Sequence, residues 1–245
     1  MERLKDKVII ITGAAQGMGK VHAKCAIEEG AKVVITDINA EKGNEVAKDL
    51  GDNALFIKHN VADEDDWKRV VQETEDKWGR IDVLVNNAGI TYNMKIDEIT
   101  LEDYMKILNI NQVSVFLGIK YVSEVMKAQK SGAIINVSSM NGLVGGAIGY
   151  TDTKFAVRGM TKAAARELSP YNITVNSVHP GVIQTPMLEQ PGVKEAVDKF
   201  KQTILMRRVA EAEEVSRMII FLASDEARYS TGSEFVIDGG VTATV

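Results

Sequence analysis

The sequence contains one cysteine, Cys25, among 245 residues, so no disulfide can form within the chain. The residues from Met1 to Lys5 also lack the apolar core of a cleavable leader, and we therefore expect the protein to stay in the reducing cytoplasm. The longest apolar runs, such as residues 218–223, are far shorter than the ~20 residues that a membrane span requires. The sequence thus predicts neither export nor membrane insertion.

Basic residues are not in excess either, because 29 lysines and arginines face 34 aspartates and glutamates and give a formal net charge of -5. This balance provides no basic surface for nucleic acid or anionic lipid, and it repels acidic protein partners. The three histidines, His22, His59 and His179, are scattered without metal-ligand spacing, so we expect no metal site. A neutral small molecule is the favoured partner.

Short β-branched segments alternate with longer segments whose apolar residues recur every three or four positions. This alternation predicts a parallel sheet of about seven strands with helices on both faces, a doubly wound α/β fold of the Rossmann type. No linker, repeat or low-complexity tract divides the chain, so we predict a single domain over residues 1–245. The expected strands are 8–12, 32–36, 54–59, 82–85, 133–137, 173–178 and 234–237, and the expected helices are 17–29, 40–50, 63–78, 101–130, 150–168 and 211–223.

The stretch from residue 180 to about residue 200 departs from this alternation. It contains three of the four prolines, Pro180, Pro186 and Pro191, and its apolar periodicity is weak. Ligands of doubly wound folds bind beyond the carboxyl ends of the strands, where such loops lie. We expect a functional loop here, with the substrate loop over about residues 182–200.

A glycine-rich turn, Thr12-Gly13-Ala14-Ala15-Gln16-Gly17-Met18-Gly19, follows the first expected strand and leads into a helix. Glycines let backbone N–H groups approach a pyrophosphate, and the helix N-terminus supplies about half a positive charge. The turn therefore predicts a dinucleotide-binding cradle. A glycine turn required only for packing is the alternative.

Asp37 ends the second expected strand, about eighteen residues after Gly19 and close to the ~20 expected for recognition of a ribose hydroxyl. A carboxylate accepts hydrogen bonds from ribose hydroxyls and repels a 2′-phosphate. No lysine or arginine stands at positions 14–16 or 38 to attract such a phosphate. Asp37 therefore predicts NAD as the cofactor, and a cap for the helix near Ala40 is the alternative role.

Tyr150 and Lys154 are four residues apart at the start of an expected helix, so they share one face. A free tyrosine has a pKa of ~10, and proton transfer near neutrality requires a reduction of about three units. The positive charges of Lys154 and of an oxidised nicotinamide ring are two sources of that reduction. The same spacing also occurs on many solvated helices.

Two further sets of polar residues lie next to apolar segments. Ser138 and Ser139 follow the expected strand 133–137, where a hydroxyl can orient a substrate oxygen or simply cap a turn. Asn111 lies within an apolar stripe, where an unsatisfied amide costs ~1–3 kcal/mol. We therefore expect Asn111 to have a specific partner, and bridging of backbone groups through water is the alternative.

These residues together resemble the short-chain dehydrogenase/reductase family, and the resemblance covers nearly the whole chain. The family transfers a hydride between a carbinol carbon and nicotinamide C4 on a doubly wound sheet, with a tyrosine moving the proton. The motifs that carry the resemblance are Thr12-Gly13 to Gly19, Asn86-Asn87-Ala88-Gly89, Asn111, Ser138-Ser139, Tyr150 with Lys154, Pro180-Gly181 and Asp238-Gly239-Gly240.

The resemblance implies a role for each matching residue. Tyr150 is the general acid/base, Lys154 adjusts the pKa of the phenol and binds the nicotinamide ribose, Ser139 holds the substrate oxygen, and Asn111 joins a proton-relay water to Lys154. Ile183 and Thr185 hold the nicotinamide carboxamide. The implied cofactor-binding residues are Gly13, Gln16, Gly17, Met18, Gly19, Asp37, Ile38, Asn60, Val61, Asn87, Ala88, Gly89, Tyr150, Lys154, Pro180, Gly181, Ile183 and Thr185.

Three positions depart from the family pattern. The segment between Ser139 and Tyr150 is about two residues shorter than usual, which leaves Ser138 as a second candidate for the substrate-oxygen role. Asn60 replaces the aspartate that often faces the adenine ring. Asp152 places a carboxylate between Tyr150 and Lys154, and we expect it to be peripheral because its side chain points off their shared face.

Residues 143–148 and 182–188 are largely apolar and contain no lysine or arginine, which predicts a neutral, hydrophobic secondary alcohol as substrate. Residues 175–187 are similar to family members that oxidise cyclic alcohols or hydroxysteroids. Two alternatives stay open: a 3-oxoacyl-[acyl-carrier-protein] reductase, which Asp37 and the net acidity oppose, and a non-catalytic NAD-binding regulator. The family also implies a homotetramer with an interface at residues 101–130, 150–168 and 241–245.

Overall fold

The chain folds around one seven-stranded sheet whose strands are all parallel, in the order β3-β2-β1-β4-β5-β6-β7. The structure, a computed structural model, describes residues 2–92, 95–185, 188 and 193–244. The predicted doubly wound sheet of seven strands is confirmed. The strands are β1 (Val8–Thr12), β2 (Lys32–Asp37), β3 (Ala54–Lys58), β4 (Val83–Asn86), β5 (Gly132–Val137), β6 (Ile173–Pro180) and β7 (Glu234–Ile237).

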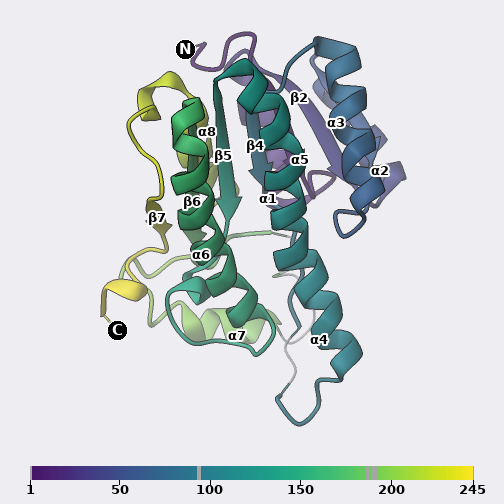
Figure 1. Cartoon of the computed structure of the whole chain (residues 1–245). Helices are drawn as coiled ribbons and strands as arrows, with labels where there is room; N and C mark the ends of the chain where they lie inside the picture. Colours follow the sequence, from purple (N-terminus) through teal and green to yellow (C-terminus); the bar gives the residue numbers. More distant parts are fainter. Residues whose placement is uncertain (1, 93–94, 186–187, 189–192, 245) are drawn as a thin grey trace.

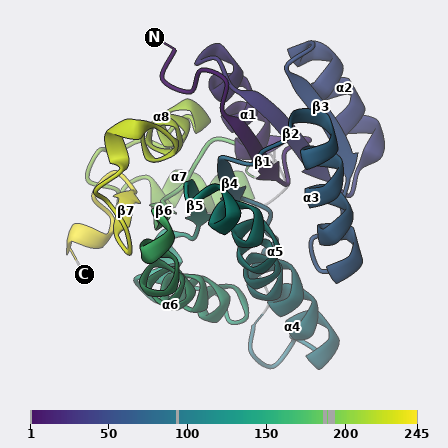
Figure 2. The ribbon, with the colours of Figure 1, turned by 45° about the horizontal axis from the view of Figure 1, so that its top comes forward.

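Helices cover both faces of the sheet (Figures 1 and 2), because successive strand residues point to opposite sides. The helices are α1 (Gly17–Glu28), α2 (Ala40–Leu50), α3 (Glu64–Trp78), α4 (Leu101–Leu108), α5 (Ser114–Gln129), α6 (Tyr150–Leu168), α7 (Val193–Phe200) and α8 (Ala212–Ala223). On β1, Ile9 and Ile11 join the apolar core under α1 and α8, whereas Ile10 joins the core under α3, α5 and α6.

The helix predicted over residues 101–130 is interrupted in the structure. A π-helical turn, Asn109–Val113, separates α4 from α5, so the three pieces follow one another without a loop. Such a turn adds one residue to the local backbone repeat, and π-turns occur often at functional sites. Here the turn contains Asn111. In Figure 1, α4 extends past the carboxyl ends of the strands.

The expectation of a loop over residues 180–200 is wrong in part. Strand β6 continues to Pro180, and residues 193–200 form α7, which lies near the carboxyl edge of the sheet in Figure 1. Between them, Ile183 pairs with Ala210, and the Gln184 N–H donates to the Ala210 carbonyl at 2.8 Å. The prolines at 186 and 191 lie outside the described residues. Helix α7 was not predicted because prolines precede it and the apolar periodicity of the stretch is weak.

The switch point of the sheet lies between β1 and β4, because the chain runs outward from β1 to β3 and then returns to the other side of β1. The loops that follow these two strands therefore lie side by side at the carboxyl edge, where doubly wound folds bind ligands. None of the helices in the described part of the chain is long and apolar enough to cross a membrane.

Candidate active site

The loops after β1 and β4 are joined by hydrogen bonds that Asn87 and Ala88 donate to Thr12. The Thr12 hydroxyl accepts from the N–H groups of Asn87 and Ala88, each at 3.0 Å, and Asn87 Nδ2 donates to the Thr12 carbonyl at 2.8 Å. Asn87 Oδ1 is buried with no hydrogen-bond partner among the described residues. Sequence reasoning did not single out Thr12 as a residue of the site, although it stands directly before Gly13 in the motif.

The glycine turn packs closely and also leaves a helix end open. Gly13 has φ +64°, and a Cβ there would lie 2.9 Å from Ala88 Cα; a Cβ on Gly19 would lie 2.4 Å from the Gly13 carbonyl oxygen. Helix α1 begins at Gly17, and within the described structure its first turn has neither a side-chain cap nor an acidic residue. The close packing therefore requires glycine at positions 13 and 19, and the uncapped N-terminus of α1 also suits an anion.

The Asp37 carboxylate lies against the glycine turn. Its Oδ2 accepts from the Ala15 N–H at 3.1 Å, and its Oδ1 accepts from the Asn39 N–H at 3.0 Å. The cap of α2 is Asn39, whose side chain accepts from the Lys42 N–H at 3.0 Å. The alternative that Asp37 caps this helix is therefore wrong. Ile38, beside it, is 66% exposed.

Lys42 brings a positive charge to the same place, which sequence reasoning missed. Its Nζ donates to Oε1 of Gln16 in the glycine turn at 3.1 Å. The absence of lysine and arginine at positions 14–16 and 38 therefore does not leave the turn without a cation. The sequence did not indicate this contact, because Lys42 lies in the first turn of α2, away from the positions of the glycine motif.

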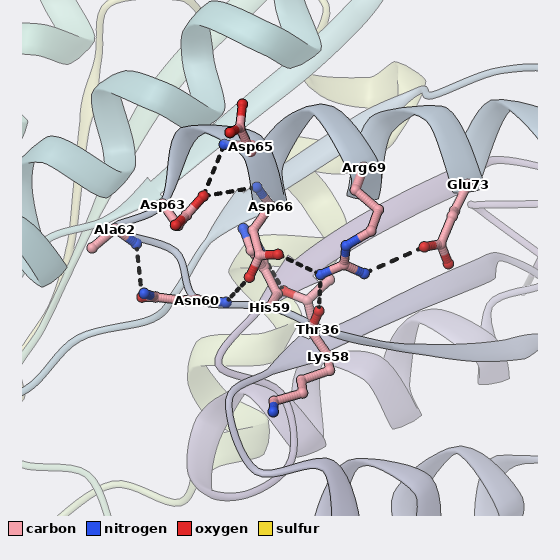
Figure 3. Close-up of polar contacts among 10 residues, drawn as sticks. All are labelled: Thr36, Lys58, His59, Asn60, Ala62, Asp63, Asp65, Asp66, Arg69 and Glu73. Atoms are coloured by element: carbon pink, nitrogen blue, oxygen red, sulfur yellow. Dashed lines mark hydrogen bonds and ion pairs between the residues drawn. The ribbon is translucent and has the colours of Figure 1, made fainter.

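The loop after β3 is fixed by a polar network around Asn60, shown in Figure 3. The Asn60 N–H donates to Asp66 Oδ2 at 2.7 Å, and Asn60 Oδ1 accepts from the Ala62 N–H at 3.2 Å. Val61 is buried, and its carbonyl accepts from Trp67 Nε1 at 2.9 Å. The network holds Asn60 and Val61 at the carboxyl end of β3, where their adenine contacts stay a prediction.

Tyr150 and Lys154 lie in the first two turns of α6, and Lys154 is buried rather than solvated. The side chain of Lys154 donates from Nζ to the Val137 carbonyl at 3.0 Å and lies 5.5 Å from the centre of the Tyr150 ring. Burial lowers the pKa of Lys154 to about 8. Burial also raises the pKa of the Tyr150 phenol, and a hydrogen bond with Ser139 acts in the opposite direction. The surrounding side chains alone therefore do not produce the low phenol pKa that we expected.

The two serines after β5 have different surroundings. The Ser138 hydroxyl donates to the Lys154 carbonyl at 2.9 Å and is buried. The Ser139 side chain is close enough to the Tyr150 phenol to lower its pKa, and its Oγ accepts from the Asn141 N–H at 3.1 Å. Ser139 thus caps the short 3-10 turn over 140–142 and lies near the phenol, whereas Ser138 joins α6 to the end of β5.

His179, which we expected to be structural, contacts this group of residues from the next strand. Its Nδ1 lies 3.0 Å from the Ser139 carbonyl oxygen, and its Nε2 lies 2.9 Å from Ser177 Oγ. The ring is fully buried. Nothing in the spacing of the three histidines indicated this contact, because it depends on the register of β5 beside β6.

The prediction that the Asn111 amide has a specific partner is confirmed. Its Oδ1 accepts from the Ile90 N–H and its Nδ2 donates to the Ile90 carbonyl, both at 2.8 Å, so no water is needed to bridge these groups. Nδ2 also lies 3.4 Å from Thr153 Oγ1 on α6. A Cβ on Gly89 would lie 3.4 Å from Asn111 Oδ1 and 3.5 Å from Lys154 Nζ, so these three residues meet at one point.

The residues after β6 are fixed against the C-terminal segment. The Gly181 N–H donates to the Ile237 carbonyl at 2.9 Å, and a Cβ on Gly181 would lie 2.8 Å from Asp238 Cα. Ile183 is buried, and the Thr185 carbonyl accepts from the Leu188 N–H at 2.9 Å. These contacts place the Pro180-Gly181 motif at the same sheet edge as Ser139.

The structure therefore brings the predicted residues to one edge of the sheet in two groups. The first, from β1, β2 and β4, offers an uncapped helix end and a carboxylate, which suit a dinucleotide. The second, from the end of β5, the π-helical turn and α6, places a phenol near a hydroxyl and near a buried ammonium group, which suits proton transfer to or from a substrate oxygen. In the described ranges, no group of three or more His, Cys, Asp or Glu residues is arranged to hold a metal ion.

Comparison with known proteins agrees with this arrangement. The sequence profile of the family described as enoyl-(acyl carrier protein) reductase matches residues 13–242. The chain is 45% identical over 98% of its length to a 3-alpha-(or 20-beta)-hydroxysteroid dehydrogenase of Mycobacterium tuberculosis, of which it covers 91%. It is 43% identical over 99% of its length to a cyclopentanol dehydrogenase of Comamonas testosteroni, of which it covers 100%.

Two further comparisons bear on the cofactor and the fold. An NADP-dependent (R)-specific alcohol dehydrogenase of Lentilactobacillus kefiri is 40% identical, with 99% of each chain covered. Among solved structures, that of gox2181 matches with a TM-score of 0.95 and 29% identity, and the match covers 99% of this chain and 98% of the other.

Proposed function

Because the chain belongs to the short-chain dehydrogenase/reductase family and its relatives include dehydrogenases of alcohol groups, we propose that it interconverts a hydrophobic secondary alcohol and its ketone with NAD(H). The substrate class that we propose is a cyclic alcohol or a hydroxysteroid-like alcohol. The observation that carries the proposal is the position of the buried Lys154 ammonium group, 5.5 Å from the centre of the Tyr150 ring, at the sheet edge where Ser139 and Asn111 also lie.

The residues at the switch point fit a dinucleotide. The uncapped N-terminus of α1 and the close-packed glycine turn would hold the pyrophosphate, and the buried Asn87 Oδ1 offers an acceptor without a protein partner in the described ranges. When bound, the nicotinamide ring accepts or supplies the hydride and carries a positive charge in its oxidised form. Asp37 would receive the adenosine ribose hydroxyls.

Our choice of NAD over NADP rests on Asp37. Its carboxylate already accepts two backbone N–H groups, so it is held in place beside the glycine turn and would repel a 2′-phosphate. Lys42 acts against this preference because its ammonium group contacts Gln16 in the same turn. Because the relative from Lentilactobacillus kefiri is NADP-dependent, the preference is tested by comparing turnover with NAD+ and NADP+.

In the proposed oxidation, the Tyr150 phenolate takes the proton of the substrate hydroxyl, and the Ser139 hydroxyl holds the same oxygen. The positive charge of Lys154 stabilises the phenolate. Its Nζ is held near the Tyr150 ring by the hydrogen bond that it donates to the Val137 carbonyl. Asn111 is held by Ile90 and lies beside Lys154 across Gly89, in keeping with a proton path that leads away from the phenol.

The alcohol that we propose is neutral and hydrophobic. Ile148, two residues before Tyr150, leaves 39% of its surface exposed, and the segment 143–148 contains no cation. An acidic group on the substrate would find no partner in that segment. The names of the hydroxysteroid and cyclopentanol dehydrogenases support the same substrate class.

A second candidate function is reduction of a ketoacyl group on acyl carrier protein. The description of the family profile and a 42% identical FabG reductase of Thermotoga maritima favour it. The formal net charge of -5 opposes it, because an acidic protein partner would be repelled.

The cytoplasmic location and the homotetramer also stay predictions. The exposed side chains of Phe116 on α5 and Phe155 on α6 offer apolar surface for such an assembly.

The test is turnover by the wild type and by Tyr150→Phe, with NAD+ or NADP+ and a panel of cyclic alcohols, hydroxysteroids and aryl carbinols. We expect NAD+-dependent oxidation by the wild type and a loss of roughly 100-fold or more in kcat for the variant, with NAD+ affinity retained. An active Tyr150→Phe enzyme would refute the mechanism. If the enzyme turned over none of these alcohols but reduced 3-oxoacyl thioesters of acyl carrier protein with NADH or NADPH, the second candidate would be supported.

A further inference from the structure

The carboxylate between the two proposed catalytic residues has a partner on another helix. Asp152 lies in the first turn of α6, and its Oδ2 accepts a hydrogen bond from the Tyr104 hydroxyl of α4 at 2.7 Å. Its other oxygen, Oδ1, is buried with no partner among the residues that the structure describes. Partial burial of a carboxylate costs free energy unless a hydrogen bond offsets it, and the Tyr104 hydroxyl supplies that bond.

Helix α4 is the first part of the helical segment that holds Asn111. A capping box between Thr100 and Asp103 fixes its start, and its last residue leads directly into the π-helical turn. Tyr104 therefore belongs to the same continuous segment as Asn111. A contact that fixes Tyr104 also restrains the helical segment from which the amide projects.

Asp152 belongs to the turn that carries Tyr150, and two other contacts hold this turn against the same segment. A Cβ on Gly149, which has φ +79°, would lie 3.1 Å from Ile107 Cδ1, so α4 packs directly on the entry to α6. Thr153 Oγ1 donates to the Tyr150 carbonyl at 2.7 Å and lies 3.4 Å from Asn111 Nδ2. Of the three links, the one between Tyr104 and Asp152 is the one with a charged partner.

We propose that Tyr104 and Asp152 form a positioning pair that holds the first turn of α6 against α4 and thereby sets the phenol of Tyr150 relative to Ser139 and Asn111. Neither residue touches the reacting atoms. A hydrogen bond to a carboxylate is shorter and stronger than one between neutral groups, so it limits the movement of the turn more than apolar packing alone. The proposal rests on the role of Tyr150 in the proposed function.

A carboxylate in the first turn also interacts favourably with the helix dipole, and this is the alternative explanation of Asp152. Two substitutions separate the explanations. Tyr104→Phe removes the hydrogen bond and leaves the charge at the helix end. Asp152→Asn removes the charge and leaves an amide oxygen that can accept from Tyr104. The positioning pair predicts a defect for the first and rescue by the second relative to Asp152→Ala.

The experiment measures kcat, KM, NAD+ affinity and the melting temperature for Tyr104→Phe, Asp152→Ala, Asp152→Asn and the double variant Tyr104→Phe/Asp152→Ala. We expect kcat to fall about 10-fold for Tyr104→Phe and Asp152→Ala, with NAD+ affinity unchanged, because misplacement of a reacting group slows the chemical step. The double variant should be no slower than either single variant, and Asp152→Asn should keep most of the activity.

Tyr121→Phe is the matched control, because the Tyr121 hydroxyl donates to Glu64 and so joins α5 to α3 by the same kind of contact. It should keep the wild-type kcat. Wild-type kcat for Tyr104→Phe, equal losses for Asp152→Asn and Asp152→Ala, or additive losses in the double variant would overturn the positioning pair. Failure of the proposed function is recognised separately, by an active Tyr150→Phe enzyme.

Discussion

His179 on β6 and Ser139 at the end of β5 are joined by a hydrogen bond of 3.0 Å between the imidazole Nδ1 and the Ser139 carbonyl oxygen. A carbonyl only accepts, so Nδ1 carries the proton and Nε2 is left to accept from the Ser177 hydroxyl at 2.9 Å. Burial lowers the pKa of His179, which favours this neutral form. The backbone of Ser139 is thereby fixed from the neighbouring strand.

Replacing His179 should therefore slow turnover without changing cofactor binding. We expect His179→Leu to lower kcat roughly 10- to 100-fold, because the Ser139 carbonyl keeps the Gly142 N–H as a donor but loses the contact that holds it to β6. His179→Asn retains an N–H donor and should recover part of the activity. Steady-state kinetics and NAD+ titration check both variants, and equal activity of the Leu variant and the wild type would contradict the role.

Alanine replacements should separate the two adjacent serines. Ser139→Ala should lower kcat roughly 100-fold, because its hydroxyl is the one near the Tyr150 phenol, and should cost about 1 kcal/mol of stability through loss of its cap to the Asn141 N–H. Ser138→Ala should lower the free energy of unfolding by about 1 kcal/mol, because the buried Lys154 carbonyl loses a donor. Kinetics and urea denaturation of both variants test this division. A larger kcat loss for Ser138→Ala would reverse the assignment.

Cofactor preference should change when the charges near the glycine turn are changed. The double variant Asp37→Ala/Ile38→Arg removes the carboxylate and adds a guanidinium, and we expect the ratio of kcat/KM for NADP+ to that for NAD+ to rise about 100-fold. Adding Lys42→Met should reduce this gain, because its ammonium group lies at Gln16. Lys48→Met, in the last turn of α2, is the control. An unchanged ratio in the double variant would refute the role of Asp37.

Burial of Lys154 should make stability depend on pH. Its pKa is about 8 in the folded protein and ~10.5 when unfolded, so between these values the unfolded chain binds more protons and stability rises with pH. The free energy of unfolding should gain about 2 kcal/mol from this group between pH 7.5 and 9.5. Urea denaturation of the wild type and Lys154→Met at both pH values tests it. Equal pH dependence in the two proteins would contradict the shift.

Much of the fold follows from local sequence patterns. Consecutive β-branched residues such as Val8 to Ile11 are buried on both faces of a parallel sheet, and this pattern predicts a strand without any knowledge of its neighbours. The same holds for α6, whose observed bounds match the predicted 150–168. The π-helical turn at Asn109–Val113 could not be predicted in this way, because the apolar periodicity of the flanking helices continues through it.

The candidate site was predictable where a motif fixes the spacing and not where the fold creates the contact. The face shared by Tyr150 and Lys154 follows from helical periodicity. The contacts of His179 with Ser139 and of Lys42 with Gln16 depend on which strands and turns become neighbours. The depressed pKa of Lys154 likewise arises from burial under several elements, which no single segment of sequence encodes.

The hydrogen bonds between Thr12 and Asn87 also have a consequence for folding during synthesis. The two residues are 75 positions apart, and β4 is the partner of one edge of β1, so this edge stays unpaired until β4 has been made. At ~5–20 residues per second, synthesis of that stretch takes several seconds. Such distant pairings fold slowly. The nucleotide cradle is therefore completed late, and a nascent chain that stops before Asn87 cannot assemble it.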